Sequence, residues 1–442
     1  MGLPLDPAIA SMLRETEFSR QDSGNAAVYT NHAESSSQAA QLSLVRSYGS
    51  AEEAVRAELL VDIYLAGVRK GCASFPTADS LTRAFYMART QQPSVHTERW
   101  RDMLEFVVKV HVPAGERGVS AMGSAMDIVA EMMAQPLLRD AAHSERILEL
   151  AREEVIRSLE DRIQHHPSYA YSLFDLRYFP QDSPLSVPGL LDLARNATFE
   201  DIIRAYEGVF AASSPVLLLS GDSPEGIASP VLGFAAQSAG QGTLPPLEVL
   251  EMGPVGKPVA EEGPSEQTQF LRAYTLAAVP GERERSALRL VNRVFGGGWT
   301  GRLMQVVREK HHLVYGIYSG YQEYRNMIRL GTEHDPRLLG RITALTQEIA
   351  EEVFSGKFQD EEFRKVQEQA IEEMLTARGP LRSCDQPSFR IDEAHRLHVK
   401  RAGVGLAEQY ETLTSFDPAE ARHIALHYLS PGRSQIFTYG RA

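Results

Sequence analysis

Residues 295–319 read FGGGWTGRLMQVVREKHHLVYGIYS, and this stretch decides how the rest of the chain is interpreted. An apolar helical pattern ends there in three consecutive glycines. Such a turn can adopt positive φ angles and lets another backbone segment approach closely. The spacing predicts a short helix after the turn and a strand from Leu313 to Ser319.

Two polar side chains in this stretch suit the chemistry of peptide-bond cleavage. Arg308 stands seven residues before Tyr315, so a helix end and a strand start can bring both side chains to one wall of a cavity. An arginine offers a fork of N–H donors and a tyrosine offers one hydroxyl. Donors of this kind stabilise a carbonyl oxygen that gains negative charge when a peptide bond is attacked. The alternative is a structural turn with a surface arginine and a packed tyrosine.

Outside this stretch, the two halves of the chain repeat one order of elements. In each half a long helix, a second helix and a short strand are predicted, at 144–164, 199–210 and 215–219 and again at 360–377, 417–429 and 435–439. The two strands end at Gly221 and Gly440, which lie about half of the 442-residue chain apart. A repeat of this length indicates duplication.

We therefore predict an α+β fold of two homologous half-domains, each a mostly antiparallel sheet with helices packed on one face. Residues 1–222 are expected to form the first half-domain, and residues 266–442 the second. Residues 223–265 are rich in proline and glycine, which favour neither a long helix nor a strand ladder. This segment is interpreted as a linker that holds at most a short helix near 231–236.

The composition limits the classes of function. The chain has 45 basic and 58 acidic residues, a formal net charge of −13. This balance argues against a nucleic-acid binder, which needs a basic face, and favours partners or substrates with basic segments. Its two cysteines, Cys72 and Cys384, cannot build a disulfide framework. No signal-peptide pattern or membrane span is recognised, so a cytoplasmic protein is expected.

The stretch 295–319 resembles the C-terminal halves of the pitrilysin family of zinc peptidases, which includes insulinase and the mitochondrial processing peptidase. Those halves share a glycine-rich turn, a small-x-Arg-Leu stretch, Arg-Glu-Lys and a Leu-x-Tyr strand. The resemblance implies that Arg308 and Tyr315 are the pair that reaches the zinc site of the other half or subunit. Gly296, Gly297 and Gly298 match a longer loop that contacts substrate in a non-catalytic mitochondrial subunit.

The zinc motif of the active members is absent from this chain. In that motif, His-x-x-Glu-His places two zinc ligands and a catalytic base on one helix face. The helix expected at 54–67 carries Glu58 and Asp62 but no histidine. Glu153 and Glu154, where a third ligand is expected, are interpreted as a solvated helix face. We expect no metal in this chain, and zinc only in a partner subunit.

Two histidine pairs could share a helix face. His423 and His427 are four residues apart, and His395 and His398 are three apart beside Glu393. Neither pair has an evident third ligand. An exposed or partner-facing surface is therefore favoured over a metal site in both places.

The resemblance implies a non-catalytic subunit of a heterodimeric zinc metallopeptidase, inactive alone. Its partner would be a homologous catalytic chain with His-x-x-Glu-His, and its substrate a peptide, as in leader-peptide removal. Two alternatives remain open. One is an inactive structural subunit, like the core proteins of a respiratory complex, and the other is a module that binds peptides without cleaving them.

Overall fold

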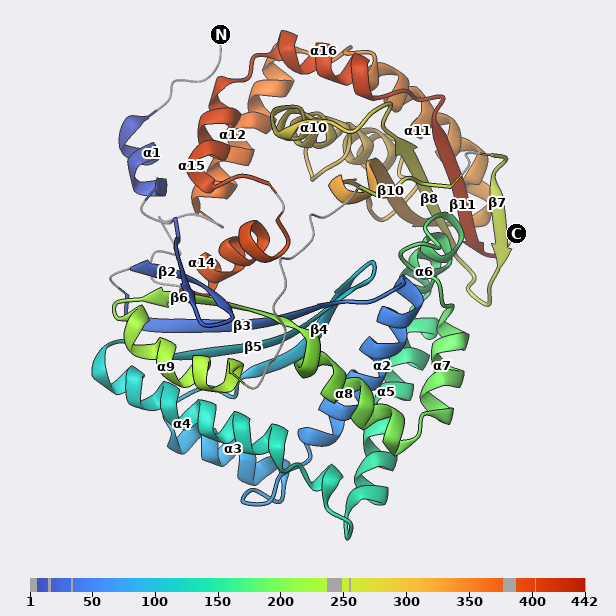
Figure 1. Cartoon of the computed structure of the whole chain (residues 1–442). Coiled ribbons are helices and arrows are strands. Elements are labelled where there is room, and N and C mark those ends of the chain that lie inside the picture. Colours follow the sequence, from blue (N-terminus) through green and yellow to red (C-terminus); the bar gives the residue numbers. More distant parts are fainter. Residues whose placement is uncertain are drawn as a thin grey trace.

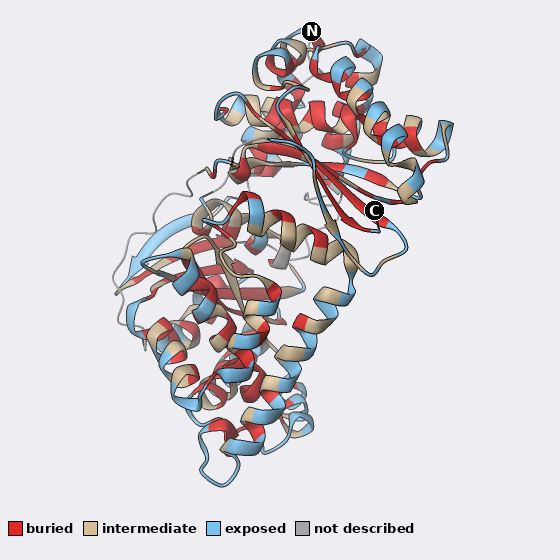
Figure 2. Cartoon of the chain, turned by 90° about the vertical axis from the view of Figure 1, so that its right-hand side faces the viewer, coloured by how far each residue is buried: buried red, intermediate tan, exposed pale blue. Residues whose placement is uncertain are grey.

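The computed structural model describes residues 6–14, 17–32, 35–236, 249–253, 256–376, 387–401 and 403–441. These residues form two halves that face each other, and each half holds one sheet with helices over its outward face (Figure 1). The strands are largely buried, whereas the outer helix surfaces are exposed (Figure 2). The predicted α+β fold of two similar halves is confirmed.

The first sheet has six strands in the order β1-β2-β6-β3-β5-β4. Its strands are β1 Ser19–Ser23, β2 Ala26–His32, β3 Ser37–Ser47, β4 Ser94–Trp100, β5 Met103–Pro113 and β6 Ser214–Gly221. Neighbours are antiparallel except β2 and β6, which run parallel. The two longest strands, β3 and β5, pair along their whole length and form the centre of the sheet.

The second sheet has five strands in the order β7-β11-β8-β10-β9. They are β7 Val259–Glu262, β8 Thr268–Thr275, β9 Ile317–Gln322, β10 Met327–His334 and β11 Ser434–Gly440. Here too one pair is parallel, β7 with β11, and the others are antiparallel. This order matches that of the first sheet without β1, as the duplication predicts.

The outward helices bury apolar stripes against their own sheet. In the first half these helices are α2 Ala51–Val68, α3 Ala78–Met87, α4 Gly115–Ala134, α5 Ser144–Gln164, α7 Val187–Asn196 and α8 Phe199–Ala212. In the second half they are α10 Glu282–Phe295, α11 Leu339–Phe354, α12 Asp360–Thr376, α15 Leu406–Ser415 and α16 Pro418–Tyr428. Among the helices described, none is both long and apolar enough to cross a bilayer.

The two halves exchange helices across the space between them. Helix α6, His166–Tyr178, comes from the first half but packs on the inward face of the second sheet. Helix α14, Pro387–Ala394, comes from the second half and packs on the inward face of the first sheet (Figure 1). Helix α1, Pro7–Arg14, likewise leaves the first half to pack against α15. Each half therefore completes the core of the other.

The expected linker is shorter at both ends than residues 223–265. Helix α9, Pro224–Ala235, belongs to the first half, because Ile227, Val231 and Phe234 are buried in its core. Strand β7 belongs to the second sheet, where it pairs with β11. Proline lies at the first turn of α9, where its missing N–H is not needed, so it did not prevent a helix. Residues 237–248 of the expected linker lie outside the described residues.

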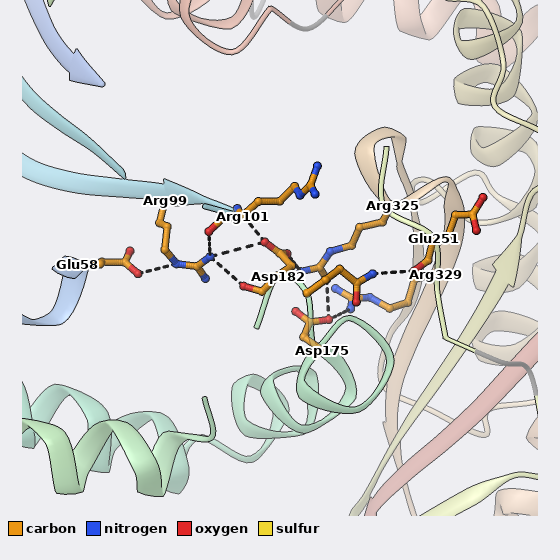
Figure 3. Close-up of polar contacts among 9 residues, drawn as sticks. Glu58, Arg99, Arg101, Asp175, Asp182, Glu251, Arg325 and Arg329 are labelled. Atoms are coloured by element: carbon orange, nitrogen blue, oxygen red, sulfur yellow. Dashed lines mark hydrogen bonds and ion pairs between the residues drawn. The ribbon is translucent and has the colours of Figure 1, made fainter. Parts of the chain in front are cut away.

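A buried network of charges joins the halves where α6 ends (Figure 3). Arg325, in the turn between β9 and β10, donates to Asp175 at 2.6 Å and to Asp182 at 2.7 Å. Arg329 on β10 also donates to Asp175, at 2.9 Å. Asp182 additionally accepts from the backbone N–H of Arg101, at 3.0 Å, so that strand β4 is tied to the same carboxylate.

We predict that Arg325→Leu lowers the free energy of unfolding by about 3–5 kcal/mol, because buried Asp182 would lose its short ion pair with Arg325 and keep only the longer one with Arg99, at 3.7 Å. Urea unfolding monitored by circular dichroism measures this loss. Arg337→Leu is the matched control, since the Arg337 side chain is 88% exposed. Equal stability of the two variants would contradict a structural role for the network.

Candidate functional site

The glycine turn joins the end of helix α10 to strand β9. The carbonyl of Gly296 accepts from the N–H of Ser319 at 2.8 Å. The buried Asn292 side chain completes the join, because its Oδ1 accepts from the Ser319 hydroxyl at 2.7 Å. A Cβ atom on Gly296 would lie 2.4 Å from Leu303, so only glycine lets the chain pack this closely. The turn is therefore a fixed element of the second half.

Residues Met304–Lys310 form a π-helical segment after the turn. Its wider winding is seen in the bond from the His311 N–H to the Val306 carbonyl, 3.1 Å long. Strand β9 then starts at Ile317 and not at Leu313, as the sequence had suggested. Residues 313–316 instead make an irregular connection that leaves Tyr315 outside the ladder. π-Helical turns of this kind are frequent at functional sites.

The structure brings Arg308 and Tyr315 together. The Arg308 guanidinium carbon lies 5.6 Å from the centre of the Tyr315 ring and 5.1 Å from that of Trp299. Tyr315 is 92% exposed and Trp299 is 63% exposed. Tyr318 meets Trp299 edge to face, at 6.1 Å between ring centres. We call Trp299, Arg308, Tyr315 and Tyr318 the aromatic patch.

The sequence analysis did not identify Trp299 or Tyr318 as members of this patch. Both flank residues that it did identify, but only the folded turn shows that Trp299 reaches back to Arg308. Arg308 also donates to the neighbouring Glu309 at 2.8 Å. Arginine over an aromatic face is held by the attraction between its charge and the ring electrons. The patch therefore presents an oriented donor and a phenol to whatever approaches this surface.

The three glycines do not act as one surface. Gly297 and Gly298 line a small polar cavity of about 220 Å³ together with Trp299 and residues of α10 and α12. Gly296 lies beneath them, against Leu303. Arg293 and Glu373 form an ion pair of 2.6 Å beside the cavity. The expected substrate contact of the turn therefore rests on Gly297 and Gly298 alone.

In the first half, α2 stands where the family's zinc helix was expected. Glu58 is held by Arg99 at 2.9 Å, and Asp62 accepts from the Thr97 hydroxyl at 2.5 Å. Burial raises the pKa of both carboxyl groups, that of Asp62 to about 6. Both carboxyls thus already have protein partners on β4.

The expected position of a third zinc ligand is occupied by ion pairs. Glu154 on α5 contacts Lys70 and also Arg69, the latter at 3.3 Å. Partial burial raises the pKa of Glu154, but Lys70 and Arg69 together lower it by more, so the pKa lies below its ordinary value. Glu153 is exposed, as expected. Two cationic side chains therefore neutralise the carboxylate that a metal ion would have bound.

The two histidine pairs behave differently. His423 and His427 are both exposed on α16. His395 and His398 point apart, because His395 contacts Glu105 whereas His398 stacks on Tyr29 at 4.1 Å between ring centres. Neither pair forms the two-histidine site that its spacing allowed.

Comparison with known proteins gives a family match over part of the chain and a fold over nearly all of it. Residues 196–370 match the model described as the peptidase M16 inactive domain. No curated protein matches the sequence.

Solved structures cover nearly the whole chain. A conserved protein from Enterococcus faecalis has a TM-score of 0.78 at 15% identity, over 96% of this chain and 99% of that one. A peptidase M16 inactive domain from Pseudomonas fluorescens has a TM-score of 0.75 at 16% identity, over 96% and 98%. The periplasmic protease PqqL from Escherichia coli has a TM-score of 0.68 at 13% identity, over 96% of this chain and 46% of its own.

We predict that Asp62→Asn stabilises the protein above pH 6, by up to about 3 kcal/mol. The raised pKa means that the folded state holds the proton more tightly than the unfolded chain does. The protonated Asp62 side chain therefore contributes its full share to the free energy of unfolding below about pH 4. This contribution is lost as the pH rises to about 6. The difference in melting temperature between variant and wild type, followed from pH 4 to 8, measures it. A difference that does not change with pH would contradict the assignment.

Proposed function

We propose that this chain is a relative of the M16 peptidases that lacks the zinc-binding motif, and that it is the non-catalytic subunit of a two-chain zinc metallopeptidase. Its partner is a homologous chain with His-x-x-Glu-His. The partner's zinc supplies the activated water for hydrolysis. This chain supplies a wall of the substrate chamber and hydrogen-bond donors.

One observation carries the proposal. The guanidinium of Arg308 and the phenol of Tyr315 are neighbours on an exposed surface, and the Tyr315 ring makes no ladder contact that would explain it as core. A tyrosine that is 92% exposed beside an arginine contributes little to packing, but it is suited to binding a polar group. Donors in such a position stabilise the negative charge that develops on a scissile carbonyl oxygen.

In the proposed cycle, Arg308 exchanges partners. In the isolated chain it donates to Glu309, whose side chain is 51% exposed. A pair this open to water contributes little stability, so a carbonyl oxygen that gains charge can replace the Glu309 carboxylate. Trp299 keeps the guanidinium in place during the exchange, because the ring contact does not use its N–H donors.

The chain matches 46% of the protease PqqL. In the proposed enzyme a second chain of similar length pairs with this one, and the two enclose the substrate. Enclosure favours peptides or unfolded segments over folded proteins. The net charge of −13 favours substrates with basic segments, and leader-peptide removal is one process of this kind.

We predict that Arg308→Ala and Tyr315→Phe each reduce peptidase turnover of the mixed complex by about 100-fold or more, since each removes one donor to the developing charge. A fluorogenic peptide, assayed with the purified chain and its His-x-x-Glu-His partner, measures the rate. Size-exclusion chromatography checks that both variants still assemble with the partner.

The matched controls are Arg337→Ala and Tyr86→Phe, because both side chains are exposed and neither belongs to the aromatic patch. Unchanged turnover in both patch variants would remove the catalytic part of the proposal. Saturable peptide binding without hydrolysis by the mixture would favour a binding module instead.

A further inference from the structure

The inward face of the first sheet carries an unusual group of polar side chains. Glu98 on β4 and Glu105 on β5 point from this face toward the segment that follows α14. That segment, His395–Val399, comes from the second half of the chain and ends against the sheet. His395 thereby meets two carboxylates that lie nearly 300 residues earlier in the sequence.

The three side chains converge on one point. The Nε2 atom of His395 lies 2.7 Å and 2.9 Å from the two carboxylate oxygens of Glu105. One ligand atom from each of Glu98, Glu105 and His395 can be chosen so that all lie within 4.8 Å of one another. The Glu105 side chain is fully buried, and the His395 side chain is only 11% exposed.

We propose that Glu98, Glu105 and His395 bind one divalent transition-metal ion, with Zn²⁺ the best match to the donor set. Imidazole nitrogen with carboxylate oxygens is a ligand set of zinc, whereas Mg²⁺ and Ca²⁺ prefer oxygen ligands alone. Zinc bonds to these atoms are about 2.0–2.2 Å long, so metal binding requires the three side chains to rotate from the contacts they make here. A water molecule completes the tetrahedron.

The burial of Glu105 favours an ion over a simple pair. A carboxylate that is removed from water needs strong compensation, and the side-chain partner described for Glu105 is His395. A divalent ion neutralises Glu98 and Glu105 together. It also joins β4 and β5 of the first half to a segment of the second half, so the metal would hold the two halves in their present arrangement.

Lys400 competes with a metal ion for the carboxylate of Glu98. Its ammonium group donates to Glu98 at 2.6 Å. The Lys400 side chain is 36% exposed, so it can turn into water when an ion takes its place. Removal of this amine should therefore tighten metal binding, whereas in a purely structural cluster it would only remove an ion pair.

Isothermal titration of the tag-free chain with zinc chloride tests the proposal. We expect one zinc ion per chain, and a melting temperature that rises with zinc concentration. Glu98→Gln should weaken zinc binding by at least about tenfold while the buried His395–Glu105 contact keeps the fold intact. Lys400→Met should bind more tightly than wild type. Magnesium chloride should give no comparable heat.

The double variant His423→Gln/His427→Gln is the control for adventitious binding, because these two exposed histidines share a face of α16. It should bind zinc as wild type does. Absence of zinc binding in the wild type would overturn the proposal. So would binding that survives Glu98→Gln and disappears in the α16 double variant.

Discussion

The guanidinium of Arg325 is the contact on which the arrangement of the two halves depends. This guanidinium is buried between the two halves. It forms ion pairs with Asp175 and Asp182, which both belong to the first half. Burial alone would lower the pKa of Arg325, but Asp175, Tyr324 and Asp182 together raise it above its ordinary value, so the cation persists. Because charges removed from water tolerate little displacement, this network fixes the angle between the sheets. The position of the aromatic patch relative to the first half follows from that angle.

Much of the fold could be predicted from the sequence, since helical periodicity and the repeated strand endings are local signals. The prediction failed where a local pattern is compatible with two partners. Helix α6 has apolar residues on most sides, and nothing in its own sequence says that Phe174 packs on the sheet of the other half. The prolines near 224–230 were read as a linker, although Pro224 lies at a helix start and α9 tolerates Pro230 within it.

In the candidate site, too, local sequence signals were predictable and contacts between distant segments were not. Arg308 and Tyr315 were identified because the motif that contains them is continuous, and the structure places the two side chains beside each other. Trp299 was missed because its contact with Arg308 depends on how the glycine turn closes. The cluster of Glu98, Glu105 and His395 could not be predicted from the sequence, because His395 lies 290 residues after Glu105.

The exchange of helices has a consequence for biosynthesis. Arg390 of α14 donates to Asn31 on β2 across 359 residues of sequence, so a segment near the C-terminus covers part of the inward face of the first sheet. While the ribosome is still making the second half, that part of the face lacks this cover. The nascent first half should thus remain incompletely packed and exposed to chaperones until translation is nearly complete.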